Sequence, residues 1–84
     1  MAFRVSVHIL PRKGLLDPQG AAVTNALHAL GFQMVRSARV GRQIVLDVAA
    51  DSAQSAERLV NEMCGRLLAN PVTEDFEIAT VEPA

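Results

Sequence analysis

The stretch Phe3-Arg4-Val5-Ser6-Val7-His8-Ile9-Leu10-Pro11 decides the fold, because it alternates apolar and polar side chains. A period of two is typical of a strand that buries one face and exposes the other. Pro11 ends the pattern, since proline has no N–H to give to a neighbouring strand. We therefore predict that the chain begins with a strand with one buried face.

A helix is predicted after the basic loop Pro11-Arg12-Lys13-Gly14. Asp17 is a candidate N-cap and Pro18 suits the first helical position, where a missing N–H costs nothing. Gly31 provides the C-terminal stop. The apolar residues recur with the spacing of one helical face: Val23, Ala26, Leu27 and Leu30. We expect this stripe to pack on the sheet.

Two further strands are predicted at residues 34–40 and 44–48, joined around Gly41 as a hairpin. The second of them turns Ile44, Leu46 and Val48 inward. The pattern thus predicts that residues 34–48 supply two neighbouring strands of the sheet.

A second helix follows, capped by Asp51 with Gln54 as a capping-box partner, or by Ser52. Its apolar stripe is Ala56, Leu59, Val60, Met63 and Leu67, and Asn70-Pro71 ends it. A last strand over residues 74–81 points Phe76 and Ile78 inward. The helix and this strand complete the set of predicted elements.

The predicted order is β-α-β-β-α-β, which indicates an α+β, ferredoxin-like antiparallel sheet with two helices on one face. Eighty-four residues make one domain, residues 1–84, with a marginal core. Because half the chain is hydrophobic, apolar surface should be left over for association with another chain. The fold class by itself does not identify a function.

Composition excludes several classes of protein. No apolar run approaches the roughly 20 residues of a membrane span, and no signal peptide opens the chain. A net charge of −1 with three Phe and no Tyr or Trp lacks what nucleic-acid binding needs. The single cysteine, Cys64, cannot form an internal disulfide, so a cytoplasmic location fits best.

Charge is distributed unevenly along the chain. Residues 1–42 carry six basic groups against Asp17, whereas residues 43–84 carry two basic groups against eight carboxylates. Either the basic half forms a face for a partner, or the two halves attract each other within the fold. Arg36, Arg39 and Arg42, near Gly41, are the candidates for a basic tip that meets a partner carboxylate.

The two predicted helices differ in their outer faces. Residues 18–30 contain no charged side chain, and the face opposite the stripe offers Gln19, Ala22, Asn25, His28 and Ala29. The second helix instead carries four charged residues: Glu57, Arg58, Glu62 and Arg66. Interface cores are depleted in charge, so we expect the back of the first helix to lie in an interface. A weakly polar exposed helix is the alternative.

The chain shows no catalytic or metal-ligating constellation. Cys64 fits a buried structural thiol, and neither His8 nor His28 has a second ligand at metal spacing. Lys13-Gly14 before a helix could receive an anion, but Asp17 already fills the capping role there and adds negative charge. Glu74-Asp75 suits a solvated strand start. We predict no catalytic residue, no metal and no cofactor bound by this chain.

Several motifs together resemble the PurS family, the small subunit of phosphoribosylformylglycinamidine synthase in purine biosynthesis. They are residues 13–20 (KGLLDPQG), 26–32 (ALHALGF) and 39–42 (RVGR), with Met63-Cys64 and residues 67–72 (LLANPV). The resemblance covers nearly the whole chain. Departures are mild: Arg42 stands where lysine is usual, Phe76 where tyrosine is common and Thr73 where an aliphatic residue is common.

The resemblance implies a non-catalytic accessory role. In this family a large synthetase subunit of the PurL type uses ATP and magnesium to activate formylglycinamide ribonucleotide. A glutaminase subunit of the PurQ type releases ammonia, and the small subunit helps to join the two. Homodimers or tetramers are expected, with a ferredoxin-like lobe that exchanged strands can complete. The alternatives are a dimeric regulatory module that binds a small metabolite, and a weak anion-binding enzyme that uses Arg12 and Lys13.

The candidate interface residues share a place in the basic loop, on the back of the first helix, near Gly41 or at the end of the second helix. They are Arg12, Lys13, Asp17, Gln19, Ala22, His28, Ala29, Arg36, Arg39, Gly41, Arg42 and Asn70.

Overall fold

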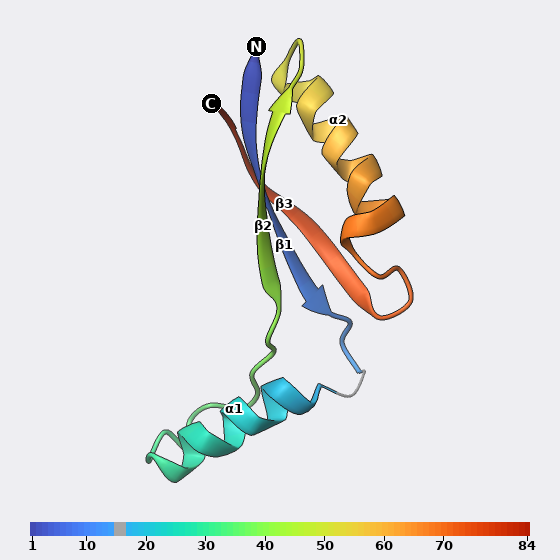
Figure 1. The fold of residues 1–84 in the computed structure, drawn as a ribbon. Coiled ribbons are helices and arrows are strands. Elements are labelled where there is room, and N and C mark those ends of the chain that lie inside the picture. Colours follow the sequence, from blue (N-terminus) through green and yellow to red (C-terminus); the bar gives the residue numbers. More distant parts are fainter. Residues whose placement is uncertain (15–16) are drawn as a thin grey trace.

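The sheet of the computed structural model, which describes residues 1–14 and 17–84, has three antiparallel strands in the order β2-β1-β3 (Figure 1). β1 (Ala2–Pro11) lies in the centre, flanked by β2 (Arg42–Ala49) and β3 (Glu74–Pro83). Val5 pairs with Leu46 on one side and with Val81 on the other. The α+β class and the antiparallel sheet are confirmed, with three strands in place of the predicted four.

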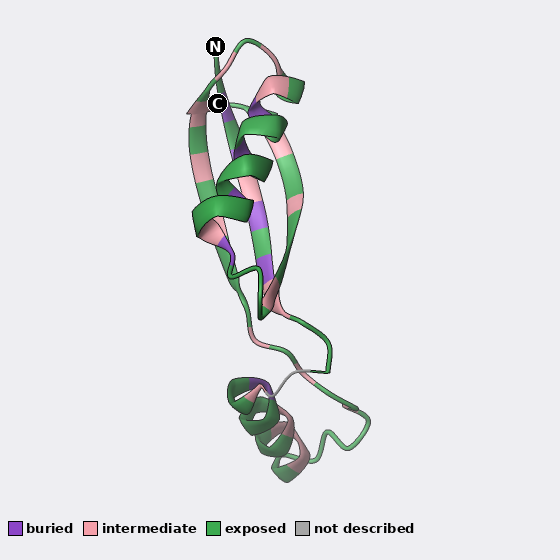
Figure 2. Ribbon diagram, turned by 90° about the vertical axis from the view of Figure 1, so that its right-hand side faces the viewer, coloured by how far each residue is buried: buried purple, intermediate pink, exposed green. Residues whose placement is uncertain are grey.

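One face of the sheet is covered by α2 (Ala53–Met63), and the core lies between them (Figure 2). The alternate residues of β1 are 5 % exposed or less: Phe3, Val5, Val7 and Ile9. They pack in one cluster with Ala56, Val60, Cys64 and Ala69. The predicted inward side of β2 (Ile44, Leu46, Val48) is half-buried against the same cluster. The apolar side chains that alternate in residues 3–9 are thus the ones that α2 covers.

A change of register in β3 adjusts which of its residues face the core. Val5 pairs with Val81 and Val7 with Ile78, so β3 has one residue more than β1 between these pairs. Such a bulge lets both Ile78 and Val81 point to the α2 side. Phe76, opposite Ile9, lies on that side too but stays 36 % exposed.

Cys64 begins a π-helical turn, η1 (Cys64–Leu68), that ends the second helix. The Ala69 N–H donates to the Cys64 carbonyl oxygen at 3.1 Å, five residues back. The wider turn shifts the helical phase, so Leu68 packs against the core while Leu67 is 82 % exposed. The prediction that Leu67 belongs to the buried stripe is wrong for this reason. Cys64 is fully buried, as expected.

Both helix caps agree with the sequence patterns. Asp17 caps α1 (Pro18–Ala29) by accepting from the Gly20 N–H at 3.1 Å, and Pro18 is the first helical residue. Ser52, the second of the two candidates, caps α2 by accepting from the Ser55 N–H at 3.1 Å. Leu15 and Leu16, which the sequence motif includes, lie outside the described residues.

The prediction that two helices lie on one face is wrong for a single chain. α1 extends away beyond the ends of the strands, while α2 alone covers the sheet (Figure 1). The predicted stripe of α1 is therefore largely uncovered: Val23 is 41 % exposed and Leu30 is 74 % exposed.

The predicted strand over residues 34–40 and its hairpin are also wrong. The chain runs from residue 37 onward into β2 without reversing at Gly41 (Figure 1). Gly41 lacks the positive φ that glycine supplies in a tight hairpin turn; Gly14 and Gly31 have it. Residues 34–40 run on from the arm and do not pair with β2, and no strand among the described residues pairs with the outer edge of β2.

The molecule is extended for its size. Its radius of gyration is 16.0 Å, whereas a compact domain of this length has a value of about 12 Å. Its accessible surface of 5935 Å² exceeds the roughly 4,900 Å² expected for a folded monomer of this mass. The excess is of the order that one partner buries in a standard interface, about 800 Å².

Candidate functional site

The link between sheet and helix is organised by one carboxylate. We call residues 11–14 and 37–41 the neck, and residues 17–36, which include α1, the arm. Asp17 Oδ1 accepts from the Gly20 N–H at 3.1 Å, and its Oδ2 accepts from the Val40 N–H at 3.2 Å. Asp17 thereby caps α1 and ties the start of the arm to the segment that returns to β2.

Two glycines allow the backbone segments of the neck to approach closely. A Cβ at Gly20 would collide with the Ala38 carbonyl oxygen, and a Cβ at Gly41 with the Ile9 carbonyl oxygen. Gly20 is also the buried residue of α1. These contacts explain why the motif residues Asp17 and Gly20 occur together: the glycine makes room for the segment that the carboxylate holds.

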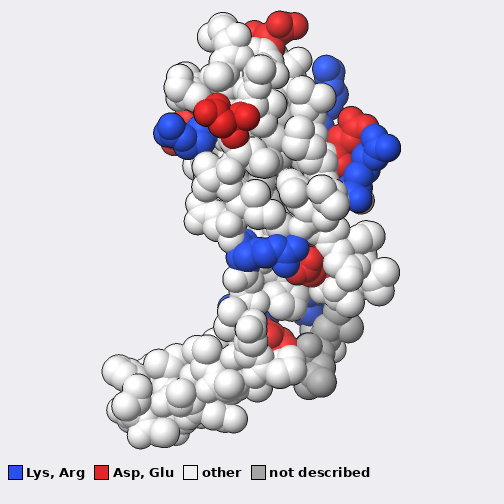
Figure 3. All heavy atoms as spheres, viewed as in Figure 1, with Lys and Arg blue, Asp and Glu red and all other residues white. Residues whose placement is uncertain are grey.

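The arm folds on itself and presents apolar side chains. His28 donates from Nε2 to the Val35 carbonyl oxygen at 2.7 Å, and the Gln33 amide donates to the His28 carbonyl oxygen at 2.6 Å. Leu30, Phe32 and Met34 are 74, 49 and 73 % exposed. Figure 3 shows the α1 part of the arm as an extension without Lys, Arg, Asp or Glu on the viewed face. The arm is a preformed element with an uncovered apolar surface.

A second apolar surface lies beside α2, over β2. This α2 groove has a volume of about 490 Å³ and is lined by Leu46, Leu59, Glu62, Met63, Arg66, Leu67 and Leu68. Leu59 and Met63 belong to the stripe predicted to be buried, yet they are 38 and 36 % exposed. The groove lies on the face of the sheet that α2 covers, over β2, and the predicted fold places its first helix there.

Arg42 and Glu74 form the best-connected ion pair of the described residues. Arg42 donates from Nη1 to Glu74 Oε2 at 2.6 Å and from Nη2 to Oε1 at 3.1 Å, and Nη2 also donates to the Leu68 carbonyl oxygen at 2.7 Å. The Asn70 N–H donates to Glu74 Oε1 at 2.8 Å. The hydrogen bonds from Arg42, then from Asn70, lower the pKa of Glu74, and Glu74 raises the pKa of Arg42.

This pair corrects two expectations. Glu74 was predicted to be a solvated strand start, but its side chain joins the start of β2 to the start of β3 and to the end of η1. Arg42 was grouped with a protruding basic tip, but the chain's own acidic half neutralises it. Sequence reasoning missed the pair because its members are 32 residues apart.

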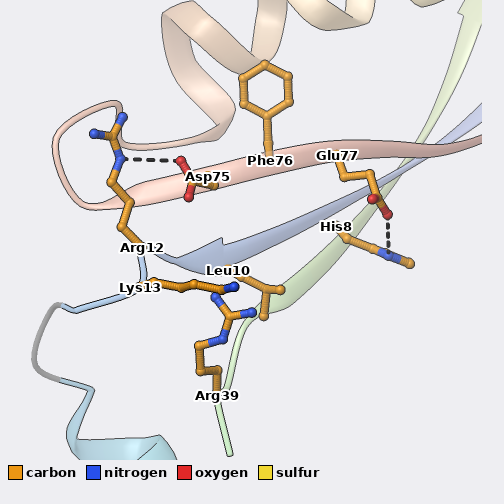
Figure 4. A pocket seen from close by; sticks show the side chains of 8 residues that line it. All are labelled: His8, Leu10, Arg12, Lys13, Arg39, Asp75, Phe76 and Glu77. Atoms are coloured by element: carbon orange, nitrogen blue, oxygen red, sulfur yellow. Dashed lines mark ion pairs between the residues drawn. The ribbon is translucent and has the colours of Figure 1, made fainter.

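The neck has three basic residues, and only one of them forms an ion pair within the described part of the chain. Arg12 lies 3.3 Å from Asp75 Oδ1 and donates to the Pro71 carbonyl oxygen. Lys13 and Arg39 make no ion pair with any carboxylate of residues 1–14 and 17–84. In Figure 4 their side chains come from different directions and their charged ends converge beside Leu10, where both line the same cleft. Sequence reasoning named both residues but did not place them side by side.

The structure brings together part of the predicted set of interface residues. The members in or next to the neck are Arg12, Lys13, Asp17, Arg39 and Gly41. Gln19, Ala22 and Ala29 are exposed on α1, and Arg36 is exposed on the arm. Asn70 lies in the loop before β3, where its side chain accepts from the Val72 N–H at 3.0 Å. Their role toward a partner stays a prediction.

The described part of the chain offers little catalytic chemistry. Within it, no three His, Cys, Asp or Glu residues are grouped to hold a metal ion. Burial raises the pKa of the Cys64 thiol, which keeps it protonated and a poor nucleophile. None of the helices there has the length and apolar character to cross a membrane.

Comparison with known proteins decides the family. The sequence model of the PurS family, described as phosphoribosylformylglycinamidine (FGAM) synthase, matches residues 4–82. The chain belongs to the PurS family. The PurS subunit of this synthase from Bacillus subtilis is 38 % identical over 80 residues, which cover 95 % of this chain and 94 % of that protein. The resemblance found in the sequence motifs is therefore confirmed, and the chain is a PurS-type subunit of the synthase of purine biosynthesis.

Solved structures of the family share the fold. The structure of Thermus thermophilus PurS has a TM-score of 0.88 at 34 % identity and covers 100 % of this chain and 99 % of its own. A chain of the structure of PurLQS from Thermotoga maritima has a TM-score of 0.85 at 29 % identity, covering 94 % of this chain and 96 % of that one. The extended three-stranded form with its separate arm agrees closely with these neighbours.

Proposed function

We propose that this chain is the non-catalytic small subunit that docks a glutaminase subunit onto an ATP-dependent synthetase subunit. Ammonia from glutamine would then reach formylglycinamide ribonucleotide without escaping into water. The T. maritima neighbour belongs to an assembly named PurLQS, which supports partners of the PurL and PurQ types. ATP and magnesium would be used by the PurL-type partner, in a cytoplasmic complex.

The observation that carries this proposal is the exposed arm, whose helix α1 has no charged side chain. An isolated chain that leaves Leu30, Phe32 and Met34 exposed on an extended element loses hydrophobic stabilisation that a partner can restore. Docking a source of ammonia next to its acceptor contributes to catalysis by removing the entropic cost of their encounter. A subunit that only holds its partners together needs binding surfaces but no catalytic side chains.

We further propose that the first partner is a second copy of the chain. The α2 groove is apolar, lies where the predicted fold has its first helix, and is next to the unpaired edge of β2. The arm supplies what is missing there: a helix with an apolar stripe, followed by residues 34–40 with strand-like alternation. Reciprocal exchange of arms would complete two ferredoxin-like lobes in a homodimer, and two dimers would give a tetramer.

Gel filtration with the two expected partners tests the docking role. The purified chain, a PurL-type subunit and a PurQ-type subunit are mixed with and without glutamine and Mg-ADP. We expect one complex of all three that is lost when the chain is omitted. A complex of the other two subunits that forms and functions equally well without the chain contradicts the proposal.

Turnover by the isolated chain tests the non-catalytic part. We expect no hydrolysis of ATP or glutamine, because the described residues hold no activated nucleophile or metal site. Turnover that copurifies with the chain and survives Cys64→Ala would favour the anion-binding enzyme instead.

A further inference from the structure

We propose that the neck carries a binding site for the phosphate group of a small metabolite, with Lys13 and Arg39 as its ligands. The site is a cleft of about 580 Å³ at the end of the sheet, lined by His8, Leu10, Arg12, Lys13, Arg39, Asp75, Phe76 and Glu77. Its volume lies within the range of small-molecule sites, roughly 300–1,000 Å³. This inference is independent of the docking role.

The cationic wall of the cleft comes from two separate segments. Lys13 follows β1 and Arg39 precedes β2, and their charged ends lie together beside Leu10 (Figure 4). Two neighbouring cations repel each other unless an anion lies between them. A phosphate dianion offsets both charges, and its several oxygens suit a guanidinium fork together with an ammonium point charge.

The opposite wall is acidic, and its Asp75 carboxylate is already paired. Asp75 lies 3.3 Å from the Arg12 guanidinium, and Glu77 lies 3.8 Å from His8 Nδ1 (Figure 4). An anion is therefore directed to the side of Lys13 and Arg39, while the rest of the cleft has room for the organic part of the ligand. This division favours a phosphorylated small molecule over a larger polyanion, which the acidic wall would repel.

Arg39 is held in place by the neck itself. Arg39 donates from Nη1 to the Pro11 carbonyl oxygen at 3.2 Å, and Asp17 accepts from the Val40 N–H. Gly41 packs against the Ile9 carbonyl oxygen. The site differs from the helix N-terminus considered from the sequence, where Asp17 fills the capping role. It depends on Arg39, which sequence reasoning did not connect with Lys13.

Titration of the isotope-labelled full chain with inorganic phosphate, and separately with ribose 5-phosphate, tests the site. Ionic strength is held constant with sodium chloride, and backbone amide shifts are recorded. We expect saturable shifts confined to residues 10–14 and 37–41, with tighter binding of ribose 5-phosphate. Lys13→Gln and Arg39→Gln should each weaken binding about tenfold, as for loss of a charge-assisted hydrogen bond.

Arg58→Gln and Arg66→Gln are the matched controls, because each removes one positive charge from α2 or η1 at a distance from the neck. Both should bind with the affinity of the unmodified chain. Shifts that do not saturate, or equal weakening by the controls, would overturn the proposal. A chain that binds neither probe, but whose Lys13 and Arg39 variants assemble poorly with the synthase subunits, would assign these cations to a partner's carboxylates. That outcome overturns the phosphate site and leaves the docking role standing.

Discussion

α1 and α2 have similar lengths, yet only α2 is strongly amphipathic and only α2 covers the sheet. Ala56 and Val60 of α2 are fully buried, whereas Val23 and Leu30 of the arm are 41 and 74 % exposed. The outer face of α2 carries charged residues, and α1 carries none. The comparison teaches that an apolar stripe in the sequence does not by itself show that a helix packs on the sheet of its own chain, and that the uncovered helix is the one without charged residues.

The largest expected effect separates the two helices directly. Val60→Asp places an unpaired carboxylate in the core between the sheet and α2 and should destabilise the fold by more than about 4 kcal/mol, or prevent folding. Leu30→Asp should change the stability of the dilute monomer by no more than about 0.5 kcal/mol, because that side chain is exposed. Urea unfolding at high dilution measures both.

Leu30→Asp should have its main effect at high protein concentration, on self-association. We expect Leu30→Asp to abolish self-association in sedimentation experiments while its circular dichroism stays native. Leu30→Met, which keeps an apolar side chain, is the control and should still associate. A Leu30→Asp chain that associates normally would remove the arm from the interface.

Gly20→Ala should loosen the neck without disturbing the core. The added Cβ would collide with the Ala38 carbonyl oxygen, so the contact between α1 and the returning segment must open, at a cost of about 1–3 kcal/mol. Hydrogen exchange should accelerate at Val40 and in α1 but not in β1. Gly65→Ala, whose added Cβ would meet nothing within 4 Å, is the matched control; equal acceleration at Val40 in that variant would contradict this role of Gly20.

Arg42→Gln should cost about 1–2 kcal/mol, because it removes three hydrogen bonds that join β2, β3 and η1. The pKa of Glu74 in the folded state is lowered from its ordinary value of 4.5. The ion pair therefore stabilises the fold above pH 4.5, and this stabilisation is lost as pH falls through the folded-state pKa. Thermal melting should therefore show a difference between Arg42→Gln and the unmodified chain that narrows below about pH 4.5.

Two controls sharpen that result. Arg66→Gln breaks an exposed pair with Glu62 and should change stability by less than about 0.5 kcal/mol. Arg39→Gln should cost less than Arg42→Gln, about 0.5 kcal/mol, since Arg39 pairs with no described carboxylate and loses one exposed hydrogen bond, to the Pro11 carbonyl oxygen. If all three arginine variants melt alike, the distinction between a structural Arg42 and an available Arg39 fails.

The smallest effect concerns Cys64. Because burial raises its pKa, the native thiol should react with iodoacetamide at neutral pH far more slowly than a free thiol, and at the rate of a free thiol in urea. Rapid alkylation without unfolding would show that the core around Cys64 opens easily. Mass spectrometry of quenched samples gives the rates.

The features set by local chemistry could be predicted from the sequence. Asp17 and Ser52 cap their helices, and the alternation of residues 3–9 gave the buried face of β1. The phase of residues 64–68 could not be predicted, because a π-helical turn moves Leu67 outward without a clear pattern in the sequence.

The placement of α1 and residues 34–40 could not be predicted for a single chain, for a different reason. Periodicity indicates which face of an element is apolar, but not which copy of the chain supplies the covering surface. Glu74 was missed because its partners, Arg42 and Asn70, become neighbours only after the strands pair. The sequence identified the neck residues individually, but their positions relative to one another could be seen only in the structure.

Isotope-filtered NMR on a mixture of labelled and unlabelled chains tests most directly whether the arm is covered by a second copy. We predict contacts between methyl groups of Leu27 and Leu30 in one copy and of Leu46 and Leu59 in another. Such contacts should vanish in Leu30→Asp. A mixture that sediments as a monomer of 9.0 kDa at millimolar concentration and shows no contact between copies would contradict the account.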